Sequence, residues 1–216
     1  MKHITILEQN FFSFEEVKDI KNKVLELRSM WYTPPQDLQR NQVTVNYLAT
    51  ALYTVSSLGI KLYKKNVIEY NPIMFENFSA YYVKIKEAIE DKLKVKAIFS
   101  RNINHPGFHI HSNETNDEAH YNHVHYHTDT FELHGLIPQG KFYSFNIPIS
   151  VPLNGSSLSY MKNGFQTLEY KEGMLALWNG DLKHGINLFK LVDRNDYRIN
   201  MQMHISVVNK NAYVFW

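Results

Sequence analysis

Three residues that commonly bind metal ions occur in an informative order in this chain. His127 and Asp129 are two positions apart, and His184 follows much later, just before Gly185. Side chains at positions i and i+2 of a β-strand lie on the same face. Together with an imidazole from a distant strand, such a pair can occupy one triangular face of an octahedral ion and leave three positions open. An isolated His-x-Asp occurs readily by chance, so its significance depends on the rest of the sequence.

Histidines are concentrated around this motif. Eight of the 11 histidines lie between residues 105 and 134. A strand over Tyr121 to Asp129 would place four potential ligands on one face, namely His123, His125, His127 and Asp129. Protonation of one imidazole disfavours protonation of the next, so a metal or a carboxylate makes such a cluster more tolerable. For the histidines upstream of His123, we favour a hydrated, partly exposed loop.

A second set of polar residues lies on a strand predicted from Tyr197 to Val208. Its apolar face comprises Tyr197, Ile199, Met201, Met203, Ile205 and Val207, and its polar face comprises Arg198, Asn200, Gln202, His204 and Ser206. We expect the polar face to line a cavity. There, the Arg198 guanidinium could bind the far carboxylate of a dicarboxylic acid through a two-pronged ion pair. Considered alone, Arg198 would be a solvated surface residue.

Residues 96 to 208 resemble the Fe(II)/2-oxoglutarate-dependent dioxygenase superfamily. The resemblance rests on His127-Thr-Asp, on His184-Gly-Ile-Asn, on the later Arg198, and on Glu172-Gly-Met-Leu-Ala-Leu-Trp, which is similar to the Gly-x-Leu-x-x-Phe strand before the family's distal histidine. It implies a mainly β fold, a double-stranded β-helix (a cupin-like jelly roll) with flanking N-terminal α-helices. One domain over 1–216 is expected, with 1–95 as a mostly helical support and 96–216 as the β-helix core.

The same resemblance implies ligands and a reaction. His127, Asp129 and His184 would hold Fe(II), Arg198 would bind the C5 carboxylate of 2-oxoglutarate, and O₂ would be the second cosubstrate. Decarboxylation of 2-oxoglutarate to succinate would accompany oxidation of a small molecule or peptidyl side chain, most commonly by hydroxylation. Where the family often has Ser or Thr two positions after the arginine, this chain has Asn200, which can still donate a hydrogen bond.

Further residues are weaker candidates for the site. Asn146, on a strand predicted from Phe142 to Val151, is a candidate for the cosubstrate cavity, although a neighbouring backbone group could equally satisfy it. Substrate contacts are conceivable for His125, Glu132 and Trp178, for which a structural or supporting role is favoured.

Two alternatives share the jelly-roll architecture. A metallo-cupin would bind its metal through His125, His127, Glu132 and His184, and would be an isomerase, a dioxygenase without a cosubstrate, or a binding module. The spacing around His184 does not fit that pattern. A non-enzymatic jelly roll with a vestigial site is the other alternative.

The expected elements run from helices to strands. Ser13 and Glu16 form a predicted capping box ahead of a helical stripe, after a strand from His3 to Leu7. A second helix is predicted from about Phe75 to Leu93, and Val43 to Val55 is ambiguous and partly helical. Strands are predicted over Ala97 to Arg101, Phe108 to Ser112, Tyr121 to Thr128, Phe142 to Val151, Leu158 to Met161, Met174 to Trp178 and Tyr197 to Val208.

Composition excludes several function classes. The chain has 216 residues, 44% hydrophobic, a formal charge of +2 and no cysteine. Disulfides, thiolate metal sites and cysteine nucleophiles are therefore excluded, and a cytoplasmic location is the default expectation. The near-neutral charge, with no arginine after Arg198 of the kind found in oxygenases that repair nucleic acids, argues against nucleic acid as a partner. No segment has membrane-spanning length.

Overall fold

The computed structural model describes residues 6–8, 10–33, 43–122 and 124–216. Its helices are α1 (Phe14–Glu26), α2 (Val55–Leu58) and α3 (Ile60–Leu93), with the 3₁₀ turns η1 (Arg28–Met30) and η2 (Leu52–Thr54). Its strands are β1 (Ile6–Glu8), β2 (Thr44–Leu48), β3 (Lys96–Phe99), β4 (Gly107–Ser112), β5 (Ala119–Tyr121), β6 (Lys141–Ser150), β7 (Ser157–Met161), β8 (Phe165–Glu169), β9 (Leu175–Asn179), β10 (His184–Ile186), β11 (Phe189–Leu191), β12 (Arg198–Val208) and β13 (Asn211–Phe215).

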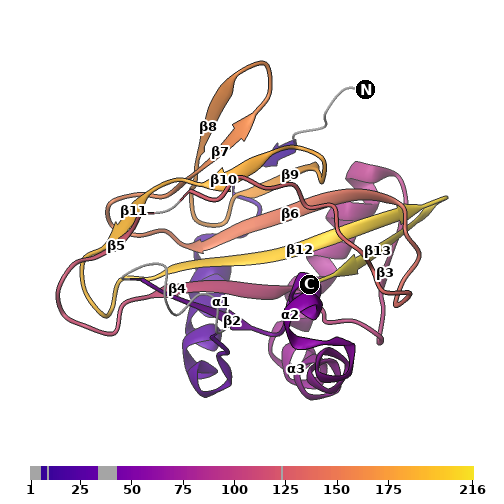
Figure 1. Cartoon of the computed structure of the whole chain (residues 1–216), viewed down its shortest axis with the longest axis horizontal. Coiled ribbons are helices and arrows are strands. Elements are labelled where there is room, and N and C mark those ends of the chain that lie inside the picture. Colours follow the sequence, from indigo (N-terminus) through magenta and orange to yellow (C-terminus); the bar gives the residue numbers. More distant parts are fainter. Residues whose placement is uncertain (1–5, 9, 34–42, 123) are drawn as a thin grey trace.

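The strands form one large sheet and two small ones. The eight-stranded sheet has the order β1-β9-β6-β12-β13-β3, and β4 and then β2 join it through the first half of β12. The small sheets are β10-β7-β8 and β11-β5, and β7, β8 and β10 lie above the large sheet in Figure 1. This is the predicted mainly β jelly roll with flanking helices.

Helices α1 and α3 cover the other face of the large sheet; in Figure 1, α1 and the start of α3 lie below the sheet, and the later part of α3 lies behind it at the upper right. The buried stripe of α1, formed by Val17, Ile20 and Val24, belongs to the main core together with the buried side of α3. From β12, Ile199, Met201, Met203 and Ile205 join this core, as the predicted apolar face requires. The capping box at Ser13 and Glu16 is present, so the predicted start of α1 is confirmed.

The polar face of β12 points between the sheets and is almost completely buried. Arg198, Asn200 and His204 are each 1% exposed. Polar residues from β4 and β6 lie beside them, because His111 pairs with Arg198 and Ser144 pairs with His204 in the strand register. Buried polar groups are costly unless they have partners or serve a ligand, so this interior is where a functional site is expected.

The prediction for the second helix was wrong in extent. α3 begins at Ile60 and not at Phe75, because the apolar spacing of its buried side starts at Tyr63, and Pro72 does not end the helix. The ambiguous segment Val43 to Val55 contains β2, and only its end is helical. β1 and β2 pair with β9 and β4, so residues before 96 also contribute to the large sheet.

The strand predicted from Tyr121 to Thr128 is the main error in the second half. β5 ends at Tyr121, and the following segment is irregular apart from one bridge between His127 and His184. His123 lies outside the described residues. His125, His127 and Asp129 were expected to share one face of a strand, but the structure has no continuous strand over these residues. Within the described ranges, no helix combines the length and hydropathy needed to cross a bilayer.

Candidate metal centre

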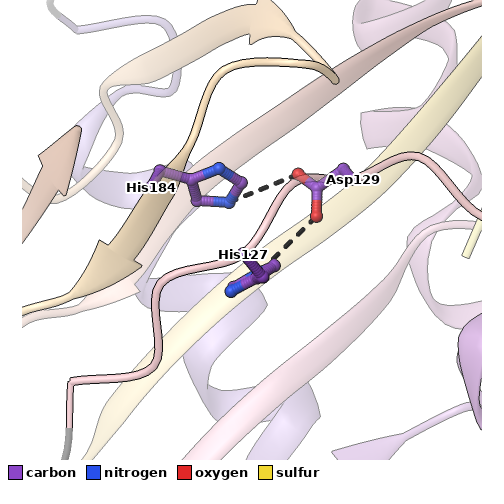
Figure 2. Close-up of side chains that lie close together, drawn as sticks. All are labelled: His127, Asp129 and His184. Carbon is purple, nitrogen blue, oxygen red and sulfur yellow. Dashed lines mark ion pairs between the residues drawn. The ribbon is translucent and has the colours of Figure 1, made fainter. Parts of the chain in front are cut away.

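The structure brings His127, Asp129 and His184 together. One ligand atom from each lies within 4.8 Å of the other two, and these three residues form the one potential metal cluster in the described part of the chain. His127 Nε2 is 3.5 Å from Asp129 Oδ1, and His184 Nε2 is 3.3 Å from Asp129 Oδ2. Figure 2 shows both rings turned toward the carboxylate. Asp129 and His184 are buried, whereas the His127 side chain is 41% exposed, so the cluster is open on one side.

Backbone hydrogen bonds hold the irregular segment of His127 and Asp129 in place. His127 and His184 exchange two N–H···O=C bonds of 2.9 Å, and the Asp129 N–H donates to the Gly180 carbonyl at 2.7 Å. Two glycines allow this close approach. A Cβ at Gly185 would lie 2.8 Å from the His125 carbonyl oxygen, and one at Gly180 would lie 3.1 Å from the Asp129 carbonyl oxygen. Larger residues there would push the ligand-bearing segments apart.

Both histidines present the same nitrogen to the centre. His127 Nδ1 lies 3.0 Å from the His125 carbonyl oxygen, and His184 Nδ1 lies 2.8 Å from that of Leu182. A carbonyl can only accept, so each Nδ1 carries the proton and donates it. In the neutral ring the lone pair is then on Nε2, which faces Asp129 and can bind a metal ion. A backbone carbonyl that fixes the tautomer is the usual support of a ligating histidine.

Asp129 is held as a carboxylate. Burial raises the pKa of this carboxyl, but the nearby imidazoles of His204, His184 and His127 and a hydrogen bond from the Ser144 hydroxyl lower it. The net pKa of Asp129 lies below its ordinary value. Two imidazole nitrogens and one carboxylate suit a divalent first-row metal such as Fe(II). They would occupy one face of the ion and leave its other coordination positions open. The residues present therefore fit the group that the sequence implies.

Ser144 was not recognised in the sequence. Its hydroxyl, on β6, donates to Asp129 Oδ2 and lies 3.4 Å from His204 Nδ1 on β12. Ser144 thus connects the Asp129 carboxylate to strands β6 and β12 of the large sheet. The hydrogen bond restricts the rotation of the Asp129 side chain, which is how a residue outside the ligand set maintains ligand geometry.

Arg198 points inward and is 1% exposed. Its Nε donates to Ser156 Oγ at 2.9 Å and its Nη1 to His111 Nδ1 at 3.3 Å. With the Asn200 amide oxygen turned toward it, the guanidinium also donates to Asn200 at 2.5 and 3.0 Å. The rings of Tyr170 and Phe189 lie 5.5 and 5.7 Å away. All these acceptors are neutral.

No carboxylate of the described residues lies within ion-pair distance of Arg198. Burial lowers the pKa of Arg198, and neighbouring tyrosines raise it, but a guanidinium stays charged in a protein. A buried cation without a counter-charge is expensive. The site therefore favours an anionic group beside Arg198.

The charges of Arg198 and Asp129 both act on two further buried residues, Tyr170 and His109. Burial raises the pKa of Tyr170 to about 12, and the charges of Arg198 and Asp129 both act on this hydroxyl. Burial lowers the pKa of His109 to about 3, and the charge of Arg198 adds to the effect, whereas Asp129 opposes it. Arg198 and His204 lie on the same buried face of β12, and Ser144 connects His204 to Asp129, so the guanidinium and the metal cluster lie on the same side of the large sheet. Only the tertiary structure identifies these two residues.

The weaker candidates occupy different places. Asn146 is 4% exposed, donates to the Tyr170 hydroxyl at 3.4 Å, and leaves its amide oxygen without a partner. The ring of Trp178 is 5.1 Å from that of His184, and its indole N–H is also buried without a partner. The His125 ring stacks on His127 at 5.4 Å. Unsatisfied buried polar atoms beside a ligand cluster are consistent with a site that receives a polar molecule.

Glu132 lies apart from this site. Its side chain is 79% exposed and pairs with His134 at 3.8 Å. The ligand set of the metallo-cupin alternative is therefore not assembled, because it requires Glu132 and His125, and the cluster contains Asp129 in their place.

No protein-family model and no curated protein matches the sequence. Among solved structures, the chain is similar to a prolyl-4-hydroxylase from Pseudomonas putida, with 13% identity, 93% of this chain and 91% of that chain covered, and a TM-score of 0.43. A 2OG-Fe(II) oxygenase family oxidoreductase from Burkholderia pseudomallei has 13% identity, coverages of 96% and 86%, and a TM-score of 0.48. An N-substituted L-amino acid dioxygenase from Burkholderia ambifaria, in complex with α-ketoglutarate, has 9% identity, coverages of 78% and 77%, and a TM-score of 0.48.

The oxygenase family of the second structure is the one that the sequence resembles.

Proposed function

We propose that this chain is an Fe(II)- and 2-oxoglutarate-dependent oxygenase that oxidises a small molecule or a peptidyl side chain, most simply by hydroxylation. One observation supports this above all. A buried guanidinium with no described carboxylate partner lies on the same side of the large sheet as a cluster of two imidazoles and one carboxylate. A metal-binding hydrolase would require the metal cluster, but its reaction would not require the unpaired guanidinium of Arg198. A keto diacid would use both, because its keto acid end chelates the metal and its far carboxylate pairs with the guanidinium.

In this proposal, His127, Asp129 and His184 hold the metal through Nε2, a carboxylate oxygen and Nε2. The bound Fe(II) would supply the coupling of O₂ reduction to the decarboxylation of 2-oxoglutarate and the oxidation of substrate. The protein would control access to the metal and exclude water from it. The exposed side of His127 leaves a route to the metal, and the buried sides of Asp129 and His184 exclude water.

Arg198 is proposed to bind the far carboxylate of 2-oxoglutarate. A charged acceptor forms a stronger hydrogen bond than the neutral groups that now surround the guanidinium, so it can replace them. The free amide oxygen of Asn146 and the adaptable amide of Asn200 would adjust to the same cosubstrate. His125 and Trp178 flank the metal ligands and are proposed to border the substrate. Glu132 points elsewhere and is given no part.

Anaerobic titration tests the proposal directly. The purified protein with Fe(II) should develop a weak visible charge-transfer band when 2-oxoglutarate is added, because the keto acid chelates the metal. Aerobic incubation with a screen of candidate substrates should then form succinate. Binding of zinc or manganese without any band from Fe(II) and 2-oxoglutarate would refute the proposal.

A further inference from the structure

We infer that a cavity away from the metal centre is a second ligand site, for a small organic anion with an apolar body. The cavity has a volume of about 370 Å³ and lies between α3 and the turns at 101–102 and 135–136. This volume falls within the range of about 300 to 1,000 Å³ that is usual for small-molecule sites. Its lining includes none of the residues of the metal cluster and not Arg198.

Two cations set the charge that the ligand must carry. Lys64 and Arg101 line the cavity, and its lining contains no acidic residue. In the described part of the chain, neither cation forms an ion pair. Both side chains are exposed, and two cations beside one hollow attract an anion from solution. The long side chain of lysine and the planar fork of arginine both suit a carboxylate or a phosphate.

The apolar residues of the lining set the apolar character of the ligand. Val67 is 4% exposed and Leu136 is partly buried, and both belong to the second apolar cluster, so the wall is anchored in the core. Ile68, at the rim, is 78% exposed. An apolar group placed against this wall would be removed from water, whereas inorganic phosphate would gain nothing from it. The lining therefore favours a carboxylate with an aliphatic body over a bare anion.

This inference does not depend on the proposed oxygenase activity, because the test needs neither metal nor turnover. The metal-free protein is titrated with sodium octanoate and, separately, with inorganic phosphate, with binding followed by calorimetry. Lys64→Ala and Arg101→Ala should each raise the Kd for octanoate about fivefold or more, because each removes one charged contact. Phosphate should bind at least about tenfold more weakly than octanoate.

Lys65→Ala is the matched control. Lys65 neighbours Lys64 on the exposed surface of the same helix and does not line the cavity. Lys65→Ala therefore changes the net charge by the same amount as Lys64→Ala without altering the lining. The Kd of this variant should equal that of the unaltered protein. Thermal unfolding of each variant verifies that it folds. An absence of saturable octanoate binding, an equal loss in Lys65→Ala, full binding by Lys64→Ala, or equal affinity for phosphate would each overturn the inference.

Discussion

Replacing Arg198 by lysine separates the charge of the guanidinium from its shape. Lysine keeps the positive charge but cannot form two parallel hydrogen bonds to one carboxylate. Arg198 is 1% exposed, and solvent therefore cannot substitute for the lost bond. A hydrogen bond to a charged group contributes about 1.5 to 3 kcal/mol. The Kd for 2-oxoglutarate should therefore rise about 10- to 150-fold.

Anaerobic titration of the Fe(II)-loaded protein, followed by the visible charge-transfer band, measures this Kd. Pyruvate is the matched ligand, because it keeps the chelating keto acid and lacks the far carboxylate. Its Kd should be the same in Arg198→Lys and in the unaltered protein. Arg194→Lys, at an exposed position four residues earlier, is the control for the substitution itself. Unchanged 2-oxoglutarate affinity in Arg198→Lys, or an equal loss for pyruvate, would refute the assigned role.

Three further predictions concern the metal centre and its surroundings. Asp129→Ala should abolish Fe(II) binding in an equilibrium titration, whereas His125→Ala should retain it, and the reverse result would favour the metallo-cupin ligand set. Ser144→Ala should weaken Fe(II) binding about 10-fold or more, because the Asp129 carboxylate loses its only described hydroxyl donor, and Ser144→Thr should restore much of it in the same titration. The pKa of His109 is lowered to about 3 in the folded state, so its contribution to stability is complete above the unfolded value of 6.5 and is lost as the pH falls toward 3. Denaturant unfolding between pH 7 and pH 4 should show this as a slope of up to about 1.4 kcal/mol per pH unit that His109→Asn removes, and an unchanged slope in the variant would show that His109 is not responsible.

Local patterns in the sequence were sufficient for the features that depend on neighbours along the chain. The capping box at Ser13 and the stripe that follows it define α1, because a helix start is specified within one turn. The two-residue alternation of β12 gave an apolar face and a polar face, and the structure buries them on opposite sides of the large sheet. The order of His127, Asp129 and His184 likewise predicted a cluster that the fold brings together.

The sequence by itself determined the candidate ligands, their order along the chain and the mainly β architecture with its flanking helices. Only the tertiary structure decided the rest, because contacts between distant segments depend on strand register and on irregular backbone that has no periodic signal. The segment from Tyr121 to Asp129 was expected to be a strand, yet two glycines and three backbone hydrogen bonds hold it without one. Ser144 reaches Asp129 only because β6 lies beneath that segment, and the absence of a described counter-charge beside Arg198 appears only once its neighbours are known.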